Sequence, residues 1–461
     1  MSIKNRLILM NFLQLFVWGA WLITIANYWF GTKGWSGAEF GAIFATMGFA
    51  SLFMPTITGI IADRWINAEK LYGVLHLLYA AVLFWLPSVD SPTTFFWVMF
   101  GAMCCYMPTI ALNNSISYTA LKQAGSDVVK DFPPIRVWGT VGFIVAMWIT
   151  NLTNSKATAN QFYIAGIAAL ILAIYALLAM PKCKPGHLIN KNASLVEQFG
   201  LEAFKLFANY KMALFFIFSM FLGGALQLTN AYGDVYLDEF KHFPKYANSF
   251  VVEYSTIIMS ISQISETLFI LAIPFFLKRF GIKKVMLISM LAWVLRFGLL
   301  GLGNPTDGLW MIILSCIVYG LAFDFFNISG SLFVETNTNS KIRSSAQGLF
   351  MMMTNGFGAV LGSLTSGWLI DKYFTKSFSN SADLAQFLDT DTSNSHFINF
   401  LSKSEVNIDA LGNLSSNIYV KDWSNIWFSF ALYSLIIAIL FALFFKHEHK
   451  PNETDLTDIS H

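Results

Sequence analysis

Long apolar segments constrain this chain more than any other feature. Of its 461 residues, 56% are hydrophobic and only 12% are charged. The apolar residues gather into about twelve runs, each close to the roughly 20 residues that cross a hydrocarbon core. These runs begin near Arg6, Glu39, Leu71, Thr93, Pro133, Gln161, Lys211, Val251, Val285, Asp307, Ser344 and Trp423. We predict an all-α polytopic membrane protein and exclude a soluble or disordered chain.

The distribution of basic residues predicts how these spans are oriented. An even number of spans places both termini on one side. If that side is the cytoplasm, about nineteen Lys and Arg face inward and about eight face outward, as the positive-inside rule requires. No cleavable signal is expected, because the first apolar run is too long for a signal core. The four cysteines, Cys104, Cys105, Cys183 and Cys316, indicate neither a disulfide nor a metal site.

Two polar stretches divide the chain. The basic segment PKCKPGHLINKNASLVEQFGLEAFKLFANYK separates residues 1–181 from residues 211–461 and predicts a cytoplasmic linker over 182–210. Two six-helix halves around a midplane site are typical of major facilitator transporters. The second stretch, about residues 372–422, is too polar to cross and predicts an external loop, in which patches such as FINFL could form short helices. A tolerated insertion without a role is the alternative for this loop.

The turn after the second run reads GIIADRW and contains Gly59, Asp63 and Arg64. Major facilitators carry a Gly-x-x-x-Asp-Arg pattern at this place. There the glycine permits close helix approach, and the charged pair makes contacts that differ between inward and outward states. We predict a conformational switch at these residues. Helix capping by Asp63, with Arg64 as a topology signal, is the alternative.

Two carboxylates lie deep inside predicted spans. Glu266 occurs in IIMSISQISETLFILAIPFF and Asp324 in IVYGLAFDFFNISGSLFV. A charge at membrane depth costs several kcal/mol and is usually retained facing a protein interior or an aqueous cavity, where it has a function. The pair therefore favours a transporter.

Polar residues of the fifth and seventh runs share helical faces. Arg136, Thr140 and Phe143 are spaced i, i+4, i+7, which combines a guanidinium, a hydroxyl and an aromatic ring suited to a polar ring compound. Snorkelling of Arg136 to the headgroups is the alternative. Gln227 and Asn230, at i, i+3, carry amides that suit the edge of a nucleobase or a sugar. They could equally hold helices together.

The eighth and tenth runs combine the carboxylates with further candidates. Gln263 and Glu266 share a face, which suits a polar substrate and a proton. Neutralisation of Glu266 by Arg296 is the alternative. Tyr319 and Phe323 form an aromatic stripe beside Asp324. Such a stripe is usually packing, but the carboxylate shifts the balance towards binding.

The sequence has no signature of an enzyme. It contains no nucleophile elbow, phosphate-binding glycine loop or His-Glu-x-x-His pattern. We expect no cofactor, no metal and no nucleic-acid partner. Without a nucleotide-binding motif, the energy source is an ion gradient or passive diffusion. A membrane sensor is the alternative from another class, but the short tail supplies no signalling domain. A sugar:proton symporter is the nearer alternative.

Ordered matches along the chain resemble the nucleoside:proton symporters of the major facilitator superfamily, the nucleoside permease and xanthosine permease group. They run from QLFVWGAWL and FMPTITGIIADRW through DFPPIRVWGT, FFIFSM, STIIMSISQISETLFILAIPFF and YGLAFDFFNISGSLFVE to SSAQGLFMMMTNGFG. The resemblance implies proton-driven nucleoside import by a monomer in the lipid bilayer of the inner membrane. It also implies a central nucleoside site lined by Arg136, Thr140, Phe143, Gln227, Asn230, Gln263, Glu266, Tyr319, Phe323 and Asp324.

The resemblance also assigns roles and has two departures. It implies stacking of the base on Phe143 or Phe323, and contact with ribose or proton handling by Glu266 and Asp324. Members of the family carry an acidic residue just before the Gln-x-x-Asn pair, where this chain has Ala225. They also have a shorter last external loop. The first departure leaves Glu266 and Asp324 as the candidates for the proton.

Overall fold

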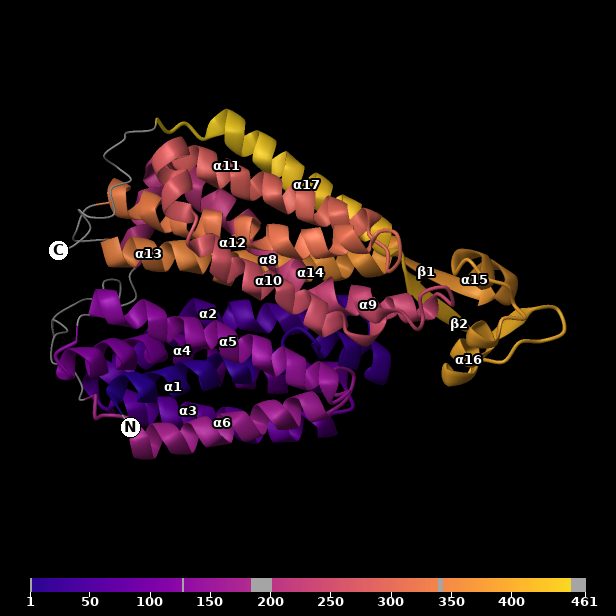
Figure 1. Cartoon of the computed structure of the whole chain (residues 1–461), viewed down its shortest axis with the longest axis horizontal. Helices are drawn as coiled ribbons and strands as arrows, with labels where there is room; N and C mark the ends of the chain where they lie inside the picture. The colour runs from indigo at the N-terminus through magenta and orange to yellow at the C-terminus, as the bar shows by residue number, and fades with distance from the viewer. Residues whose placement is uncertain (1, 127, 184–200, 339–342, 449–461) are drawn as a thin grey trace.

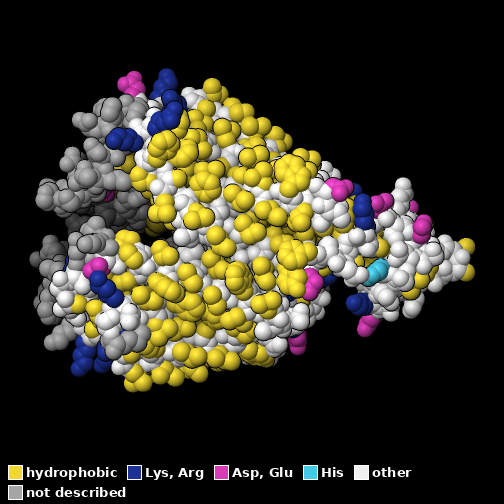
Figure 2. All heavy atoms as spheres, in the orientation of Figure 1, with side chains coloured by type: hydrophobic (Ala, Val, Ile, Leu, Met, Phe, Trp, Pro, Cys, Tyr) yellow, Lys and Arg dark blue, Asp and Glu magenta, His cyan; other side chains and the backbone are white. Residues whose placement is uncertain are grey.

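The helices form two bundles that lie side by side along the length of the molecule (Figure 1). This computed structural model describes residues 2–126, 128–183, 201–338 and 343–448. Within those residues, nine helices are long and apolar enough to cross a membrane. Apolar side chains cover the visible faces of both bundles, and charged side chains gather towards the two ends (Figure 2). The prediction of an all-α polytopic membrane fold is confirmed.

The N-terminal bundle holds the first six helices. They are α1 (Ile3–Gly19), α2 (Gly37–Arg64), α3 (Ala68–Trp85), α4 (Pro92–Gln123), α5 (Val128–Leu152) and α6 (Asn160–Ala179), with short turns η1 (Asn27–Lys33) and η2 (Leu86–Ser88). Within the bundle α1 packs on α5 and α3 packs on α6. Pro133 and Pro134 lie inside α5, further from its start than the sequence predicted. Both are exposed, so water can satisfy the carbonyls that they leave unpaired.

The C-terminal bundle contains the remaining long helices and several short ones. They are η3 (Leu201–Ala208), α8 (Tyr210–Glu239), η4 (Phe240–His242), α9 (Phe250–Glu253), α10 (Ser255–Ile270), α11 (Ile273–Leu302), α12 (Leu309–Asn337), α13 (Arg343–Met351), η5 (Met352–Gly358), α14 (Ala359–Leu369), η6 (Ile370–Phe374) and α17 (Trp423–Phe444). The helices α11 and α12 pack together, and α17 covers α11.

Breaks in the helices explain why fewer than twelve are long enough to span. The eighth run is divided between α10 and the first part of α11, and Gly281 then bends the chain into the ninth run with φ of 75° and ψ of 168°. A residue with a side chain is strained at that φ, which glycine adopts readily. The eleventh run is α13, η5 and α14 in succession. The predicted runs are present, but several are not continuous α-helices.

Small residues bring the two bundles together along α2 and α14. A Cβ atom on Gly367 would lie 3.0 Å from the Cα of Gly41, and one on Gly48 would lie 2.8 Å from the carbonyl oxygen of Gly356. At one end of this contact, the backbone N–H groups of Gly37 and Ala38 donate to the Asp371 carboxylate at 2.8 and 2.6 Å. Glycine therefore allows the helices of opposite bundles to approach backbone to backbone.

The predicted external loop is a small folded unit. Strands β1 (Thr375–Asn380) and β2 (Asn413–Lys421) pair antiparallel, with α15 (Ser381–Phe387) and α16 (Ser395–Lys403) between them. The FINFL patch lies in α16, as the sequence suggested, but the strands were not predicted. Buried side chains from both helices and from β2, including Leu384, Phe397 and Ile418, form a separate core. The unit projects from the end of the molecule opposite the chain termini (Figure 1).

The two ends of the molecule differ. At the end that carries the termini, Figure 2 shows a hollow between the bundles. At the other end, polar side chains of both bundles are in contact, among them Lys156 and Asp238. The space between the bundles is therefore closed at the end nearest to the β1–β2 unit.

Candidate functional site

Asp324 lies on α12 inside the C-terminal bundle, beside a pair of stacked rings. It is 4% exposed, and one of its oxygens, Oδ2, has no hydrogen-bond partner in the described part of the chain. The rings of Tyr319 and Phe323 stack with centroids 6.0 Å apart and planes at 12°. A buried carboxylate oxygen without a partner is unfavourable. It is therefore available to a proton or a ligand.

Arg296 of α11 makes no ion pair with Glu266 in the described part of the chain and contacts other groups instead. Its Nη1 donates to the carbonyl oxygen of Ser315 at 2.6 Å and to the hydroxyl of Ser262 at 3.4 Å. Its guanidinium carbon lies 4.7 Å from the centroid of the Tyr319 ring. The alternative that paired Arg296 with Glu266 is thus not what the described residues show. Arg296 supports the aromatic stack instead.

Glu266 lies half-buried on α10, where the two bundles meet. The carboxylates of Glu266 and Asp324 repel each other. The guanidinium of Arg136, in the opposite bundle, attracts the carboxylate of Glu266. Gln263, one turn before Glu266, is also half-buried. The fold therefore places the two predicted carboxyls within electrostatic reach of one another, and Glu266 within reach of a cation from α5.

On α5, Arg136 faces the interior of its bundle. A Cβ atom added to Gly139 would lie 2.8 Å from Nη1 of Arg136 and 3.3 Å from the carbonyl oxygen of Asn11. The guanidinium therefore does not snorkel to the membrane surface. Thr140 is half-buried, and the buried ring of Phe143 meets Trp18 edge to face at 6.3 Å.

The amide pair on α8 differs in burial. Gln227 is 9% exposed, and its Oε1 has no hydrogen-bond partner among the described residues. Asn230 is half-buried. The Oε1 atom of Gln227 therefore does not join α8 to another described helix. This oxygen is free for a ligand.

Two small cavities adjoin these residues. The first lies in the N-terminal bundle and is lined by Arg136 together with residues of α1 and α4. The second lies in the C-terminal bundle beside Phe323 and is lined by Leu222, Gly223, Leu226, Trp293, Ala322, Phe323, Phe326, Asn327, Thr354 and Asn355. The structure thus associates Arg136 and Phe323 with hollows. It brings Tyr319 and Phe323 into ring contact. Among the described residues, no hydrogen bond or ion pair joins the side chains of Thr140, Asn230 or Gln263 to the other predicted site residues.

The predicted conformational switch lies at the end of α2. A Cβ atom on Gly59 would meet nothing within 4 Å, so no close helix approach requires glycine there in this conformation. The side chains of Asp63 and Arg64 lie outside the described residues. Their contacts stay a prediction.

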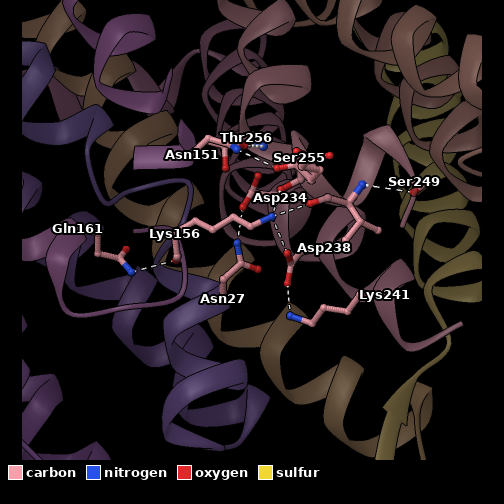
Figure 3. A network of polar contacts seen from close by, with 12 residues as sticks. Asn27, Asn151, Lys156, Gln161, Asp234, Asp238, Lys241, Ser249, Ser255 and Thr256 are labelled. Carbon is pink, nitrogen blue, oxygen red and sulfur yellow. Dashed lines mark hydrogen bonds and ion pairs between the residues drawn. The ribbon is translucent and has the colours of Figure 1, made fainter. Parts of the chain in front are cut away.

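At the closed end, polar contacts join the two bundles (Figure 3). Lys156, which follows α5, forms an ion pair with Asp238 of α8 at 2.6 Å. The same ammonium donates to the carbonyl oxygen of Val252 at 2.8 Å and to the hydroxyl of Ser255 at 3.0 Å. Because one cation contacts α8, α9 and α10 of the opposite bundle, we call Lys156 and its partners the lock.

Amides extend the lock on both sides of Lys156. Asn151 donates to the carbonyl oxygen of Glu253 at 2.9 Å and accepts from the backbone N–H of Thr256 at 3.1 Å. Asn27 of η1 donates to the buried carboxylate of Asp234. These contacts bind two separate segments of the N-terminal bundle, η1 and the end of α5 with the loop after it, to the C-terminal bundle.

The lock was not predicted from the sequence. Lys156, Asp234 and Asp238 lie at the ends of apolar runs, where charged residues normally report topology. The i, i+4 spacing of Asp234 and Asp238 at the end of an apolar run was the available signal, because it places two carboxylates on one helical face. Their partner is distant in sequence and has no local pattern.

The chain is similar to known membrane transporters over its whole length. A sequence model described as nucleoside H+ symporter matches residues 1–450. The chain is 47% identical to xanthosine permease of Escherichia coli strain K12 over 462 residues, covering 100% of both chains. It is 43% identical to nucleoside permease NupG of the same strain over 464 residues, again covering 100% of both.

Solved structures give a consistent result. The crystal structure of the nucleoside transporter NupG superimposes with a TM-score of 0.82 at 43% identity, covering 97% of this chain and 100% of that chain. A bacterial homologue of the lysosomal transporter Spinster superimposes with a TM-score of 0.64 at 13% identity, covering 99% and 97% of the two chains. At that identity the second likeness concerns the fold alone.

Proposed function

This chain belongs to the nucleoside H+ symporter family, and we propose that its nucleoside and its proton share a site between the bundles that contains Glu266 and Asp324. It is a transporter, not an enzyme. The observation that carries the proposal is the pair of carboxyls that repel each other beside the Tyr319–Phe323 stack. The guanidinium of Arg136 attracts the Glu266 carboxylate from the opposite bundle.

The base would bind on the aromatic side of this site. Phe323 lines a cavity, and a nucleobase gains from stacking on such a ring. The free Oε1 of Gln227 can accept from an exocyclic amine or a ring N–H. Phe143, Thr140, Asn230 and Gln263 complete the proposed lining. Arg136 would donate from the opposite side, so one nucleoside would contact both bundles.

The carboxyls would carry the proton. Two carboxylates that repel each other resist simultaneous ionisation, so protonation of one of the two is favoured. A substrate that contacts the same groups changes the free energy of protonation, and by reciprocity the proton changes the affinity for substrate. The proton gradient is then the energy source, without any cofactor.

The lock would act as the outer gate. With both termini in the cytoplasm, the hollow at the terminal end faces the cytoplasm and the lock faces outside. Rocking of the bundles around the site would break the lock and close the hollow, in the manner of alternating access. Each chain contains a complete site of this kind, so we propose that the monomer is the transporting unit in the bilayer.

Uptake of radiolabelled uridine by cells that express the chain tests this proposal. Uptake should exceed the empty-vector background, fall with a protonophore, and be inhibited by excess adenosine, guanosine or xanthosine but not by glucose. Inhibition by glucose without inhibition by nucleosides would instead support sugar transport. Glu266→Gln should retain binding of uridine but lose its accumulation against a gradient. Undiminished accumulation would exclude Glu266 as the essential proton carrier.

A further inference from the structure

Five of the seven residues that line the cavity of the N-terminal bundle are polar. Its lining residues are Asn11, Gln14, Leu15, Ile110, Asn113, Asn114 and Arg136, from α1, α4 and α5. It leaves about 10 Å³ for the centre of a water-sized group. This is the space of about one water molecule or one hydroxyl group. Four carboxamides and a guanidinium around so small a space make a site for a polar group.

A hydrogen-bond chain fixes the orientation of the Asn113 amide. Nδ2 of Asn11 donates to the carbonyl oxygen of Leu7 at 2.9 Å, so the oxygen of Asn11 must be the atom that faces Asn113. Nδ2 of Asn113 donates to that oxygen at 2.8 Å. The remaining atom, Oδ1 of Asn113, has no partner in the described residues, although Asn113 is only 3% exposed.

A second series of hydrogen bonds fixes the side chain of Gln14, which lines the same cavity. Nε2 of Gln14 donates to the hydroxyl of Thr109 at 2.9 Å, and that hydroxyl donates to the carbonyl oxygen of Tyr106 at 2.6 Å. The hydroxyl of Tyr72 donates to Oε1 of Gln14 at 2.5 Å. These residues are buried, so the amide of Gln14 cannot turn without losing several hydrogen bonds.

Acceptors and donors therefore face the cavity together. Oδ1 of Asn114 is buried and, like that of Asn113, has no partner among the described residues. Arg136 can only donate. A group that donates to a carboxamide oxygen and accepts from a guanidinium fits this set, and a hydroxyl does both. Unpaired buried acceptors are unfavourable until such a group arrives.

We propose that this cavity is the subsite for the 2′- or 3′-hydroxyl of the ribose of the transported nucleoside. The hydroxyl donates its single hydrogen to Oδ1 of Asn114, beside the unpaired Oδ1 of Asn113, and accepts from Arg136. The inference rests on the proposed nucleoside site, because Arg136 belongs to both. It adds residues of α1 and α4 to recognition and assigns the sugar to the N-terminal bundle, opposite the aromatic stack on α12.

Sugar-modified nucleosides test the subsite in the wild-type protein first. Labelled uridine uptake is inhibited in turn by uridine, 2′,3′-dideoxyuridine and the 2′- and 3′-O-methyl ethers. We expect dideoxyuridine to bind about five- to tenfold more weakly than uridine, the effect of one neutral hydrogen bond. At least one ether should bind more weakly still, because the cavity has no room for a methyl group. Equal inhibition by uridine, dideoxyuridine and both ethers would overturn the proposal.

A variant then tests whether the ribose hydroxyl binds in this cavity. Asn114→Ala should weaken the binding of uridine about five- to tenfold and leave the binding of dideoxyuridine unchanged. The ratio of the two affinities should therefore fall towards one. The unchanged affinity for dideoxyuridine also reports that the variant is folded. The matched control is Ser115→Ala, because Ser115 is the next residue of α4 and is exposed. Ser115→Ala should leave the ratio of the affinities for uridine and dideoxyuridine at its wild-type value.

Other results would contradict the subsite. If Asn114→Ala weakens the binding of uridine and of dideoxyuridine equally, the cavity holds only water that hydrates Arg136. If the variant instead alters the discrimination between uridine and 3-methyluridine, the cavity binds the base. Absence of any nucleoside uptake by the wild-type protein would refute the proposed function itself, which is a distinguishable result.

Discussion

Lys156→Met is the most informative change at the lock, because it removes the one cation that joins three segments of the opposite bundle. Methionine keeps most of the side-chain volume but loses the ion pair with Asp238 and the hydrogen bonds to Val252 and Ser255. Hydrogen bonds to charged groups contribute about 1.5–3 kcal/mol each. Asp238 keeps Lys241 as a partner, and water replaces other contacts when the lock opens. We therefore expect the closed form to lose about 3 kcal/mol in total, roughly a hundredfold in the equilibrium between the states.

Distance measurements by electron paramagnetic resonance can follow this shift. Spin labels at Asn160 and Asn248 report on opposite bundles near the lock, and both residues are exposed. The variant should populate a longer distance than the wild type does in the same lipid. The matched control is Lys241→Met, since Lys241 pairs with the same carboxylate but belongs to the same bundle. The reasoning is refuted if the two variants shift the distance equally, or if Lys156→Met leaves it unchanged.

Three further predictions concern other parts of the molecule. Phe323→Ala should weaken uridine binding up to about tenfold in calorimetry, because it removes the ring proposed to stack on the base, whereas Phe323→Tyr should bind normally; equal affinity of all three proteins would exclude stacking there. Gly367→Ala should destabilise the bundle contact by about 1–3 kcal/mol in thermal unfolding, while Gly348→Ala, whose Cβ meets nothing within 4 Å, should not; unchanged thermal unfolding of Gly367→Ala would contradict the close contact. Leu388→Ala, at a fully buried position of the β1–β2 unit, should destabilise that unit by about 2–5 kcal/mol and expose it to limited proteolysis without stopping uridine uptake; loss of uptake would show that the unit takes part in transport.

The sequence predicted the membrane fold well because its signal is local. Spanning helices need only apolar runs of sufficient length, and these can be read residue by residue. The charges at membrane depth, Glu266 and Asp324, were informative for the same reason. Helix breaks were harder to predict, since Gly281 adopts its left-handed φ only in the context of the packed helices.

Features that depend on distant partners could not be predicted. Asn11 and Asn113 are separated by a hundred residues and meet only when α1 packs against α4. Lys156 looks like an ordinary loop lysine until the bundles bring α8 beside it. The pairing of β1 with β2 likewise joins the two ends of a polar segment whose composition indicated a loop. Neither the register of helices nor that of strands can be read from one segment alone.

Proton movement during nucleoside transport tests the central claim most directly. Proteoliposomes containing a pH-sensitive dye are given uridine on the outside, and the internal pH is recorded. The wild-type protein should acidify the lumen when uridine enters. The double variant Glu266→Gln, Asp324→Asn should still exchange labelled for unlabelled uridine but cause no acidification. Acidification by the double variant at the wild-type ratio of protons to uridine would contradict the assignment of the proton to these two carboxyls.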